Sequence, residues 1–305
     1  MATLVFWVAI ALIVVVNTPL VSPCKWLEGA YPVTAALLIV AILAIGYALN
    51  GRPEGLIIDN RNRMSLSKLQ MLIWTVVVVS ALVVYAAYNV RLCPCNTTPL
   101  EITIPQELLF AMGIAATSFV ATPTILSLKS QDKPTTDDVK SANAAAVANN
   151  ATLQNSGKVH GRGDPSDAKW SDIFRGDEVG NFDSPDLSKI QQFAITILLV
   201  GIYSAQIIAC LAGKSCDLTA KDCTGATLNS LPVLGHDFIV LLAISHASYL
   251  VYKAAPHTAT GSDSTPNAQS GNGGQADNSQ GDNGQADNTQ AAGDQAGAAG
   301  PGGNG

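Results

Sequence analysis

A histidine within an apolar stretch is the residue of this chain best placed to do chemistry. His246 has Ser245, Ser248 and Tyr249 beside it in a run that is otherwise almost wholly apolar. An imidazole at membrane depth suggests a functional site, because ionisable residues in spans are usually functional. The structural alternative is a hydrogen-bonded histidine near the membrane surface, because Lys253 follows two turns later. Ser245, His246, Ser248 and Tyr249 form the candidate intramembrane polar cluster.

Cysteines are the second set of reactive side chains. Five of the six fall in three loops that we expect on the outer side of a membrane, and Cys210 falls near the outer end of a span. An oxidising outer compartment would allow disulfides between these loops, but the spacing does not decide the pairing. The alternative is that some serve only as small apolar residues. The candidate disulfide residues are Cys24, Cys93, Cys95, Cys216 and Cys223.

Motifs of enzymes and metal sites are not found in the sequence. It contains no His-Glu-x-x-His, no Gly-x-Ser-x-Gly and no Cys-x-x-Cys, and its four histidines lack the spacing of metal ligands. We therefore expect no catalytic residue, no metal and no cofactor, in a protein that is not an enzyme. A basic patch interleaved with aromatic residues is also missing, which argues against nucleic acid as a partner.

Composition predicts that these residues belong to a membrane protein. Of 305 residues, 48% are hydrophobic and only 13% are charged, against about 25% charged in soluble domains. Six apolar runs are expected to span the membrane, and the two that follow the repeated motif described below have about twenty residues, enough for a helix to cross a hydrocarbon core of about 30 Å. We expect an all-α membrane protein, a six-span helical bundle. The expected spans are Leu4–Leu20, Val33–Leu49, Leu69–Val90, Glu107–Leu128, Ile190–Ala212 and Asp237–Val251.

Two of these spans open with the same motif. Ser67 and Gln70, like Ser188 and Gln191, match a capping box, in which both side chains bond to backbone N–H groups at a helix start. Each box is followed by a span, an outer loop and a second span. This order suggests that spans three and four repeat in parallel as spans five and six. The alternative is that both entrances converged on a good cap followed by a lysine that reaches the membrane surface.

Charged residues collect in a few connecting segments. Thirteen of the 17 Lys and Arg fall on the side that holds residues 51–68, residues 129–189 and the tail. Positive residues favour the cytoplasmic side, so both termini are expected there. The first span is expected to be retained, because a signal peptide would carry a basic residue before its apolar run.

The long polar segment and the tail are expected to be largely disordered. Residues 129–167 contain almost no large apolar residue, and the tail is rich in Gly, Ala, Asn, Gln and Asp, so neither can bury enough surface to offset its ordering entropy. Residues 168–175 differ, because their large apolar residues share a helical face. We expect an interfacial helix there, with a linker turn as the alternative. The expected divisions are transmembrane hairpins at 1–50, 51–128 and 187–255, and polar segments at 129–186 and 256–305.

Three strings near the last two spans carry a resemblance. They are Trp-Ser-Asp-Ile-Phe-Arg-Gly-Asp-Glu (170–178), Leu-Ser-Lys-Ile-Gln (187–191) and Leu-Ala-Ile-Ser-His-Ala-Ser-Tyr-Leu-Val-Tyr-Lys (242–253). With these strings the chain resembles a group of uncharacterised bacterial multi-pass inner-membrane proteins. The resemblance covers mainly residues 60–90 and 168–254. It implies a place in the bacterial inner membrane and assigns no activity.

The leading functional hypothesis from the sequence is a non-enzymatic anchor or scaffold. The spans lack the buried charges that transport usually needs, and the two polar segments could present flexible cytoplasmic arms. Such a protein would contact the lipid bilayer and either a second copy of itself or a cytoplasmic protein partner. The alternative is a subunit of an ion channel or small-solute transporter, built from the parallel two-span repeats and using the candidate intramembrane polar cluster.

Overall fold

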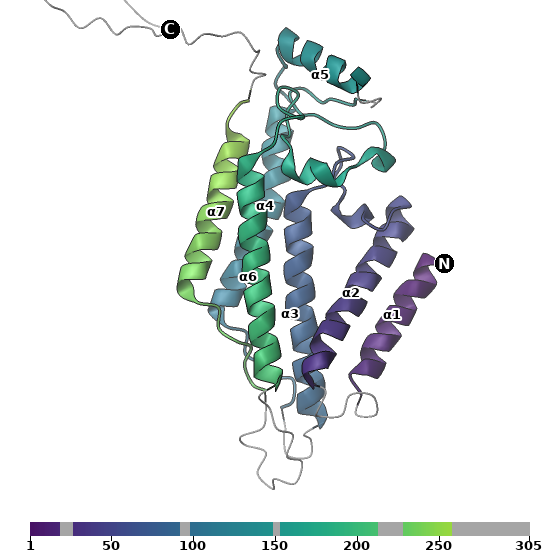
Figure 1. Ribbon diagram of the computed structural model, residues 1–305, viewed down its shortest axis with the longest axis vertical. Coiled ribbons are helices and arrows are strands. Elements are labelled where there is room, and N and C mark those ends of the chain that lie inside the picture. Colours follow the sequence, from purple (N-terminus) through teal and green to yellow (C-terminus); the bar gives the residue numbers. More distant parts are fainter. Residues whose placement is uncertain (19–26, 92–97, 149–152, 213–227, 258–305) are drawn as a thin grey trace, which may run out of the picture. The chain divides into compact units, whose positions relative to one another are not determined.

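Helices dominate the part of the chain that the computed structural model describes, which is residues 1–18, 27–91, 98–148, 153–212 and 228–257. These residues belong to one unit, and within it there are isolated β-bridges but no sheet. The mostly helical fold class is therefore confirmed. The α-helices are α1 (Ala2–Val16), α2 (Leu27–Asn50), α3 (Leu66–Arg91), α4 (Gln106–Lys129), α5 (Thr136–Ala148), α6 (Leu187–Ala212) and α7 (His236–Ala254) (Figure 1).

Five of these helices are long and apolar enough to cross a membrane, namely α2, α3, α4, α6 and α7. The shortest has 19 residues, which at 1.5 Å per residue extends over about 28 Å. Many large apolar side chains on the five helices are exposed. An apolar surface of this extent marks contact with a membrane or another protein. The five helices therefore indicate a membrane protein.

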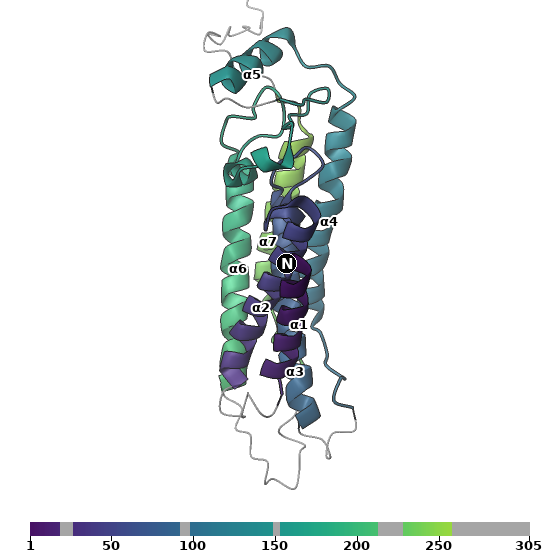
Figure 2. The same ribbon diagram turned by 90° about the vertical axis from the view of Figure 1, so that its right-hand side faces the viewer.

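The first expected span is shorter than predicted. α1 has 15 residues and is followed by Asn17, and the last two residues of the expected span lie outside the described ones. The Asn17 side chain donates a hydrogen bond to Thr34 of α2 at 2.9 Å. The two helices lie against each other in both Figure 1 and Figure 2. The six-span count is thus not confirmed. The described residues contain five candidate spans and one shorter apolar helix.

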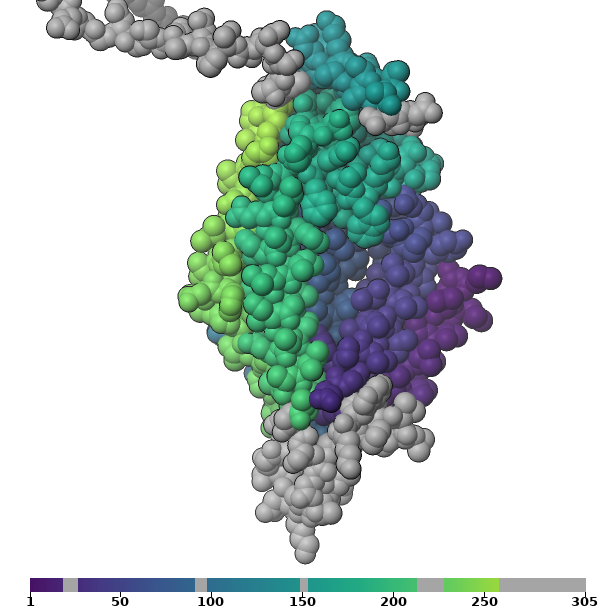
Figure 3. Space-filling view, viewed as in Figure 1, coloured from purple at the N-terminus to yellow at the C-terminus, as the bar shows by residue number. Residues whose placement is uncertain are grey.

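Four helices form the core of the bundle. α3 packs against α4 and α6, and α7 packs against the same two helices. α2 lies against α3 and α6, and α1 packs on α2 at the edge. Figure 3 shows α2 and α6 side by side on one face of the bundle.

One end of the bundle collects most of the charged residues. The starts of α3 and α6 meet the ends of α4 and α7 there, together with residues 51–65 and 153–186 (Figure 1). We call this the charged end. The segments at this end are the ones in which the sequence places most Lys and Arg. The connectors therefore lie alternately at the two ends of the bundle in the expected order.

The expected capping box of α6 is wrong, although the helix begins where predicted. The cap is Asp186, whose Oδ1 accepts hydrogen bonds from the backbone N–H groups of Ser188 at 3.0 Å and Lys189 at 3.3 Å. Gln191 is exposed, whereas the capping box would place its side chain at the backbone N–H group of the helix start. A carboxylate at this position also interacts favourably with the positive end of the helix dipole, which explains why it acts as the cap.

The capping box of α3 is wrong as well. Ser67 is buried, and its hydroxyl lies 3.2 Å from the hydroxyl of Ser65. Gln70 turns into the bundle, where it is fully buried. A glutamine at this position therefore joins helices instead of closing a helix end.

Most of the segment expected to be disordered has a defined structure. α5 occupies part of it, and after residues 149–152, which lie outside the described residues, the chain forms short antiparallel bridges such as Leu153 with Arg162. The apolar content is as low as the sequence shows. Contacts that composition does not reveal hold these residues instead. Arg162 forms a buried ion pair with Asp172, and the backbone N–H groups of Arg162 and Lys158 donate to the carbonyl oxygens of Arg61 and Lys129. The expectation for residues 258–305 falls on residues that are not described.

The expected interfacial helix is a short 3-10 helix, η4 (Trp170–Phe174). Ile173 is buried, and Phe174 packs edge-to-face on Phe193 of α6 with ring centroids 5.2 Å apart. Trp170 remains half exposed. The apolar face predicted from spacing therefore exists, but two of its three residues anchor the segment to the bundle.

Candidate functional site

Three of the four residues in the candidate intramembrane polar cluster face the interior of the bundle. Ser245, His246 and Tyr249 are each at most 2% exposed, whereas Ser248 is exposed. Successive helix residues are turned by about 100°, so Ser248 points away from the side that carries His246. The structure thus brings three of these residues inside and leaves the fourth on the surface of α7.

His246 joins three helices through one ring nitrogen. Its Nδ1 lies 2.6 Å from the Ser118 hydroxyl of α4 and 3.0 Å from the Gln192 Nε2 of α6. An amide nitrogen can only donate, so in the neutral ring Nδ1 accepts and the proton resides on Nε2. That Nε2 has no hydrogen-bond partner among the described residues. His246 therefore keeps one polar atom available inside the bundle.

Gln70 of α3 brings a fourth helix to the same level. Its Nε2 donates to the Thr196 hydroxyl at 2.7 Å, and Thr196 donates to the Gln192 carbonyl oxygen at 2.9 Å. The Oε1 atoms of both glutamines lack a partner within the described part of the chain. Buried polar atoms without partners are rare and call for an explanation. We call Gln70, Ser118, Gln192, Thr196 and His246 the buried polar layer.

A line of polar side chains connects this level with the charged end along α4 and α7. Thr122 lies one turn beyond Ser118, and its hydroxyl is 3.3 Å from the Tyr249 hydroxyl. The Lys253 ammonium group donates to the same Tyr249 oxygen at 2.9 Å and to Asp177 at 2.5 Å. The spacing of three and four residues on both helices places these groups in one row.

Asp177 is the centre of the charged end. Its Oδ2 lies 2.5 Å from Lys253 and 2.9 Å from Lys189, and its Oδ1 lies 3.0 Å from Arg61 and 3.7 Å from Arg63. All five side chains are buried or nearly so. We call them the charged cluster. It ties the loop before α3 and the segment before α6 to the beginning of α6 and the end of α7.

The balance of charges keeps Asp177 ionised. Burial raises the pKa of its carboxyl, but Lys189 and Lys253, followed by Arg61 and Arg63, lower this pKa by more. The pKa of Asp177 therefore lies well below its usual value. A buried carboxylate is tolerated only with such partners, because removing a charge from water costs several kcal/mol.

Two further acidic residues extend the charged cluster. Asp172 is fully buried and accepts two hydrogen bonds from Arg162, at 2.6 and 3.1 Å. Glu178 accepts from Lys129 at the end of α4 at 2.6 Å and lies 2.7 Å from the Nδ1 of His257. The segment that contains Asp172, Asp177 and Glu178 is thereby attached to three spans by buried charges.

His160 is a second buried histidine, outside the spans. Its ring packs on Phe182 with centroids 4.2 Å apart, and its Nδ1 lies 3.0 Å from the Asn155 side-chain oxygen. Burial, together with the positive charges of Arg63, Arg162 and Arg61, lowers the pKa of His160 to about 3. This histidine is therefore neutral at neutral pH.

Buried polar groups also continue from the polar layer toward the opposite end. Trp74 lies one turn past Gln70, and Tyr203 lies two turns past Thr196, with their ring centroids 6.5 Å apart. The Trp74 Nε1 and the Tyr203 hydroxyl have no partner among the residues described. Next to Tyr203, Ser204 accepts a hydrogen bond from Tyr31 of α2 at 3.1 Å. Polar atoms therefore occur along most of the length of the bundle.

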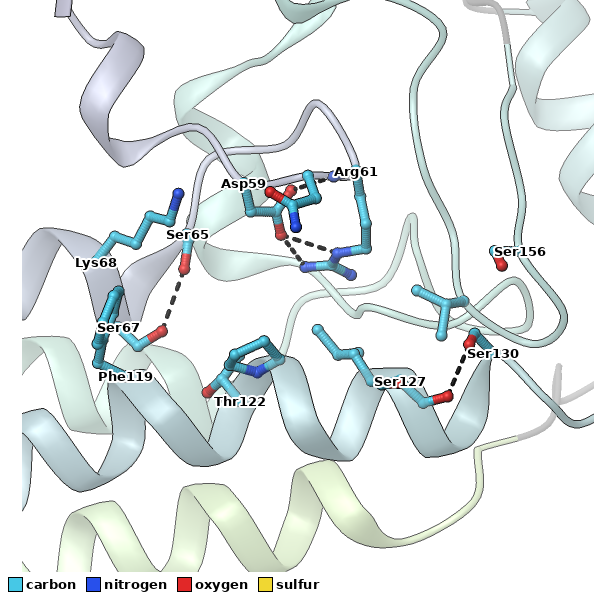
Figure 4. Close-up of a pocket in the computed structure, with 14 residues that line it drawn as sticks. Asp59, Arg61, Ser65, Ser67, Lys68, Phe119, Thr122, Ser127, Ser130 and Ser156 are labelled. Atoms are coloured by element: carbon cyan, nitrogen blue, oxygen red, sulfur yellow. Dashed lines mark hydrogen bonds and ion pairs between the residues drawn. The ribbon is translucent and has the colours of Figure 1, made fainter.

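A cavity of about 360 Å³ opens beside this row at the charged end. Figure 4 shows that α4, the loop before α3 and the region around Ser156 surround it. Thr122 lines it and also contacts Tyr249, so the cavity adjoins the row. Hydroxyl, charged and apolar groups contribute to the lining, which consists of Asp59, Asn60, Arg61, Ser65, Ser67, Lys68, Phe119, Thr122, Pro123, Leu126, Ser127, Ser130, Ser156 and Val159.

The candidate disulfides cannot be compared with the structure. Cys24, Cys93, Cys95, Cys216 and Cys223 all lie outside the described residues. Cys210 is described, and it is exposed near the end of α6 and is not in a disulfide. Of the capping residues, Gln70 belongs to the buried polar layer, and Ser67 lines the cavity, although neither was predicted to do so.

No family model, curated protein or solved structure matches this chain. The resemblance to uncharacterised bacterial inner-membrane proteins therefore stays a prediction. Among the described residues, no group of three or more His, Cys, Asp or Glu side chains is arranged to hold a metal ion. The geometry of the buried polar groups is thus the observation from which a function can be argued.

Proposed function

We propose that this protein conducts protons across a membrane, as a specific form of the channel or transporter hypothesis. The observation that carries this proposal is the buried polar layer, in which four helices surround His246. Polar groups at this depth cost free energy, and such residues in spans usually mark an ion or proton pathway. The row from Thr122 to Asp177 and the groups around Tyr203 would extend the pathway toward the two ends.

Close packing favours a proton over a larger ion. All five side chains of the buried polar layer are at most 2% exposed, which leaves little room beside them for water. A hydrated ion would need the helices to separate. A proton can move between hydrogen-bonded groups, and the neutral ring of His246 has one nitrogen that accepts a hydrogen bond and one that can donate. One helical turn separates the buried polar layer from Tyr249. Rotation of the hydroxyl groups would allow hydrogen bonds to form across this turn.

The membrane arrangement is part of this proposal. We propose that α1 completes a six-span bundle, with both termini and the charged end in the cytoplasm of a bacterium and the inner membrane around the spans. The excess of Lys and Arg at the charged end supports this orientation. We retain the parallel repeat as a proposal in which α3 and α4 correspond to α6 and α7, because each pair forms a hairpin that begins at the same end.

Proton flux into liposomes tests the proposal. Full-length protein would be incorporated into vesicles that contain a pH-sensitive dye, and a potassium diffusion potential would drive protons inward. His246→Gln keeps a hydrogen-bond acceptor for Ser118 and Gln192 but cannot exchange protons, so we expect the flux to fall about tenfold or more. The matched control is Ser248→Ala, since Ser248 is two residues away and faces outward. We expect this control to conduct like the unaltered protein.

Two outcomes of this assay would contradict the proposal. One is an unaltered protein whose flux equals that of empty vesicles. The other is a flux that His246→Gln leaves unchanged while the variant remains folded by circular dichroism and gel filtration. Either outcome would assign the buried polar layer to helix packing alone.

A second candidate function is that of an anchor or scaffold, and the position of α5 is the observation in its favour. α5 lies beyond the ends of the spans (Figure 1) and exposes Lys140, Asp137 and Val147. Its exposed side could bind a cytoplasmic protein or a second copy of the chain. Deleting residues 136–148 should release a cross-linked partner while leaving proton flux intact. The deletion removes no residue of the charged cluster. An unchanged set of cross-linked proteins after the deletion would contradict the scaffold proposal.

A further inference from the structure

We propose that the cavity at the charged end binds a phosphate group, carried either by an anionic lipid or by a free phosphate compound. The inference is independent of proton conduction, because it rests on the cavity lining and not on His246. The volume of about 360 Å³ lies within the range of small-molecule sites. Figure 4 shows Asp59, Arg61 and Lys68 on one side and α4, which contributes Phe119, Thr122 and Ser127, on the other.

Positive charge is available in the lining. Arg61 lines the cavity. Its Nε and Nη2 bind Asp59, its Nη2 also binds Asp177 at 3.0 Å, and its buried Nη1 has no hydrogen-bond partner among the described residues. Lys68 donates one hydrogen bond to the Ile58 carbonyl oxygen at 2.7 Å, which leaves two of its three N–H groups for a ligand. These two cations supply the charged donors that phosphate oxygens prefer.

The acidic residue in the lining does not oppose an anion. Asp59 receives hydrogen bonds from the Arg61 side chain at 2.6 and 2.8 Å, and from the backbone N–H groups of Arg61 and Arg63 at 2.9 and 3.2 Å. Its charge is therefore neutralised within its own loop. Arg61 is shared between Asp59 and Asp177, so Lys68 is the cation of the lining that has no acidic partner among the described residues.

Hydroxyl groups and the start of α3 complete the polar side. Ser65, Ser67 and Thr122 are buried around the cavity. Ser67 and Lys68 belong to the first turn of α3, whose backbone N–H groups have no acceptor within the helix. Donors of this kind, added to the two cations, fit a phosphate with several oxygens better than a carboxylate with two.

The apolar side of the lining suits an acyl chain. Phe119 and Pro123 of α4 are exposed and line the same cavity, together with the buried Leu126. A lipid could place its headgroup at Arg61 and Lys68 while its chain follows α4. A free phosphate compound would use the polar side only, so the two sources can be separated by experiment.

Binding to the full-length protein in detergent tests this inference. The probes are inorganic phosphate, a short-chain phosphatidylglycerol and a short-chain phosphatidylcholine as the zwitterionic comparison. We expect phosphatidylglycerol, inorganic phosphate or both to raise the unfolding temperature, with phosphatidylcholine weaker. Lys68→Gln should weaken that binding roughly tenfold, since a charged hydrogen bond contributes about 1.5 kcal/mol or more.

A second variant and a matched control keep the test decisive. Ser127→Phe should fill the cavity and abolish binding without touching the charged cluster, because Ser127 is exposed on α4. Lys140→Gln removes an exposed cation on α5 and should change nothing. Stabilisation by phosphatidylglycerol alone assigns the site to lipid, and stabilisation by inorganic phosphate alone assigns it to a free compound. No stabilisation by either probe, or binding that both variants leave unchanged, would overturn the inference.

Discussion

Replacing Asp177 with Asn should prevent stable folding of the charged end. The substitution keeps the shape of the side chain but leaves Lys189, Lys253 and the two arginines of the charged cluster without their shared counter-charge. Breaking a buried ion pair on one side costs about 3–5 kcal/mol, a large part of the total stability of a typical protein. We expect a strongly lowered unfolding temperature or loss of soluble protein in detergent.

Asp183→Asn is the matched control for this prediction. Asp183 pairs with Arg175 at 2.8 Å, but both side chains are well exposed, at 53% and 39%. An exposed pair contributes at most about 1 kcal/mol, so the control should unfold close to the unaltered protein. Equal stability of the Asp177 and Asp183 variants would show that the charged cluster does not hold this end together.

Acidification should destabilise the protein through His160 before the carboxylates titrate. An unfolded histidine has a pKa of about 6.5, whereas burial and three arginines lower the folded pKa to about 3. Between these values the unfolded chain binds a proton that the folded chain does not. The free energy of unfolding should therefore fall by about 1.4 kcal/mol for each pH unit below about 6.5.

Chemical unfolding in detergent at several pH values measures this slope. His160→Gln removes the titrating ring and keeps a side chain that can bond to Asn155, so its stability should depend less on pH between about 6.5 and 4.5. The pH dependence that remains in the variant comes from other titrating groups, and both proteins share these groups. An identical slope in the two proteins would be incompatible with a neutral, buried His160.

The spans could be read from the sequence because lipid imposes their length and composition. The expected ends of the last four spans lie within three residues of α3, α4, α6 and α7. α2 starts at Leu27, earlier than expected, and carries Pro32 inside the helix. The helix accommodates this proline because it lies near the beginning of α2.

The partners of His246 could have been found by periodicity. Gln192, Thr196, Leu199 and Tyr203 follow one another at spacings of three and four and form the buried face of α6. The capping motif predicted a role for Gln191, which is adjacent to Gln192 in the sequence but faces outward. Helical spacing therefore gives the better prediction within a span, because the interior face is decided by packing along the whole helix.

The charged cluster could not have been predicted from the sequence. Arg61, Asp177 and Lys253 are separated by more than seventy residues from one another, and nothing local shows which opposite charges meet. The low apolar content of the segment before α6 correctly excludes an apolar core there. It does not exclude order, because buried ion pairs hold residues 153–186 in place.

The most direct test of proton conduction is the reversal potential of the protein in a planar bilayer. With a pH gradient across the bilayer and equal salt on both sides, the account predicts a current whose reversal potential shifts by about 59 mV for each pH unit. Exchanging sodium for potassium on one side should leave that potential unchanged. A silent bilayer, or a reversal potential that shifts when sodium is exchanged for potassium and ignores the pH gradient, would contradict the account.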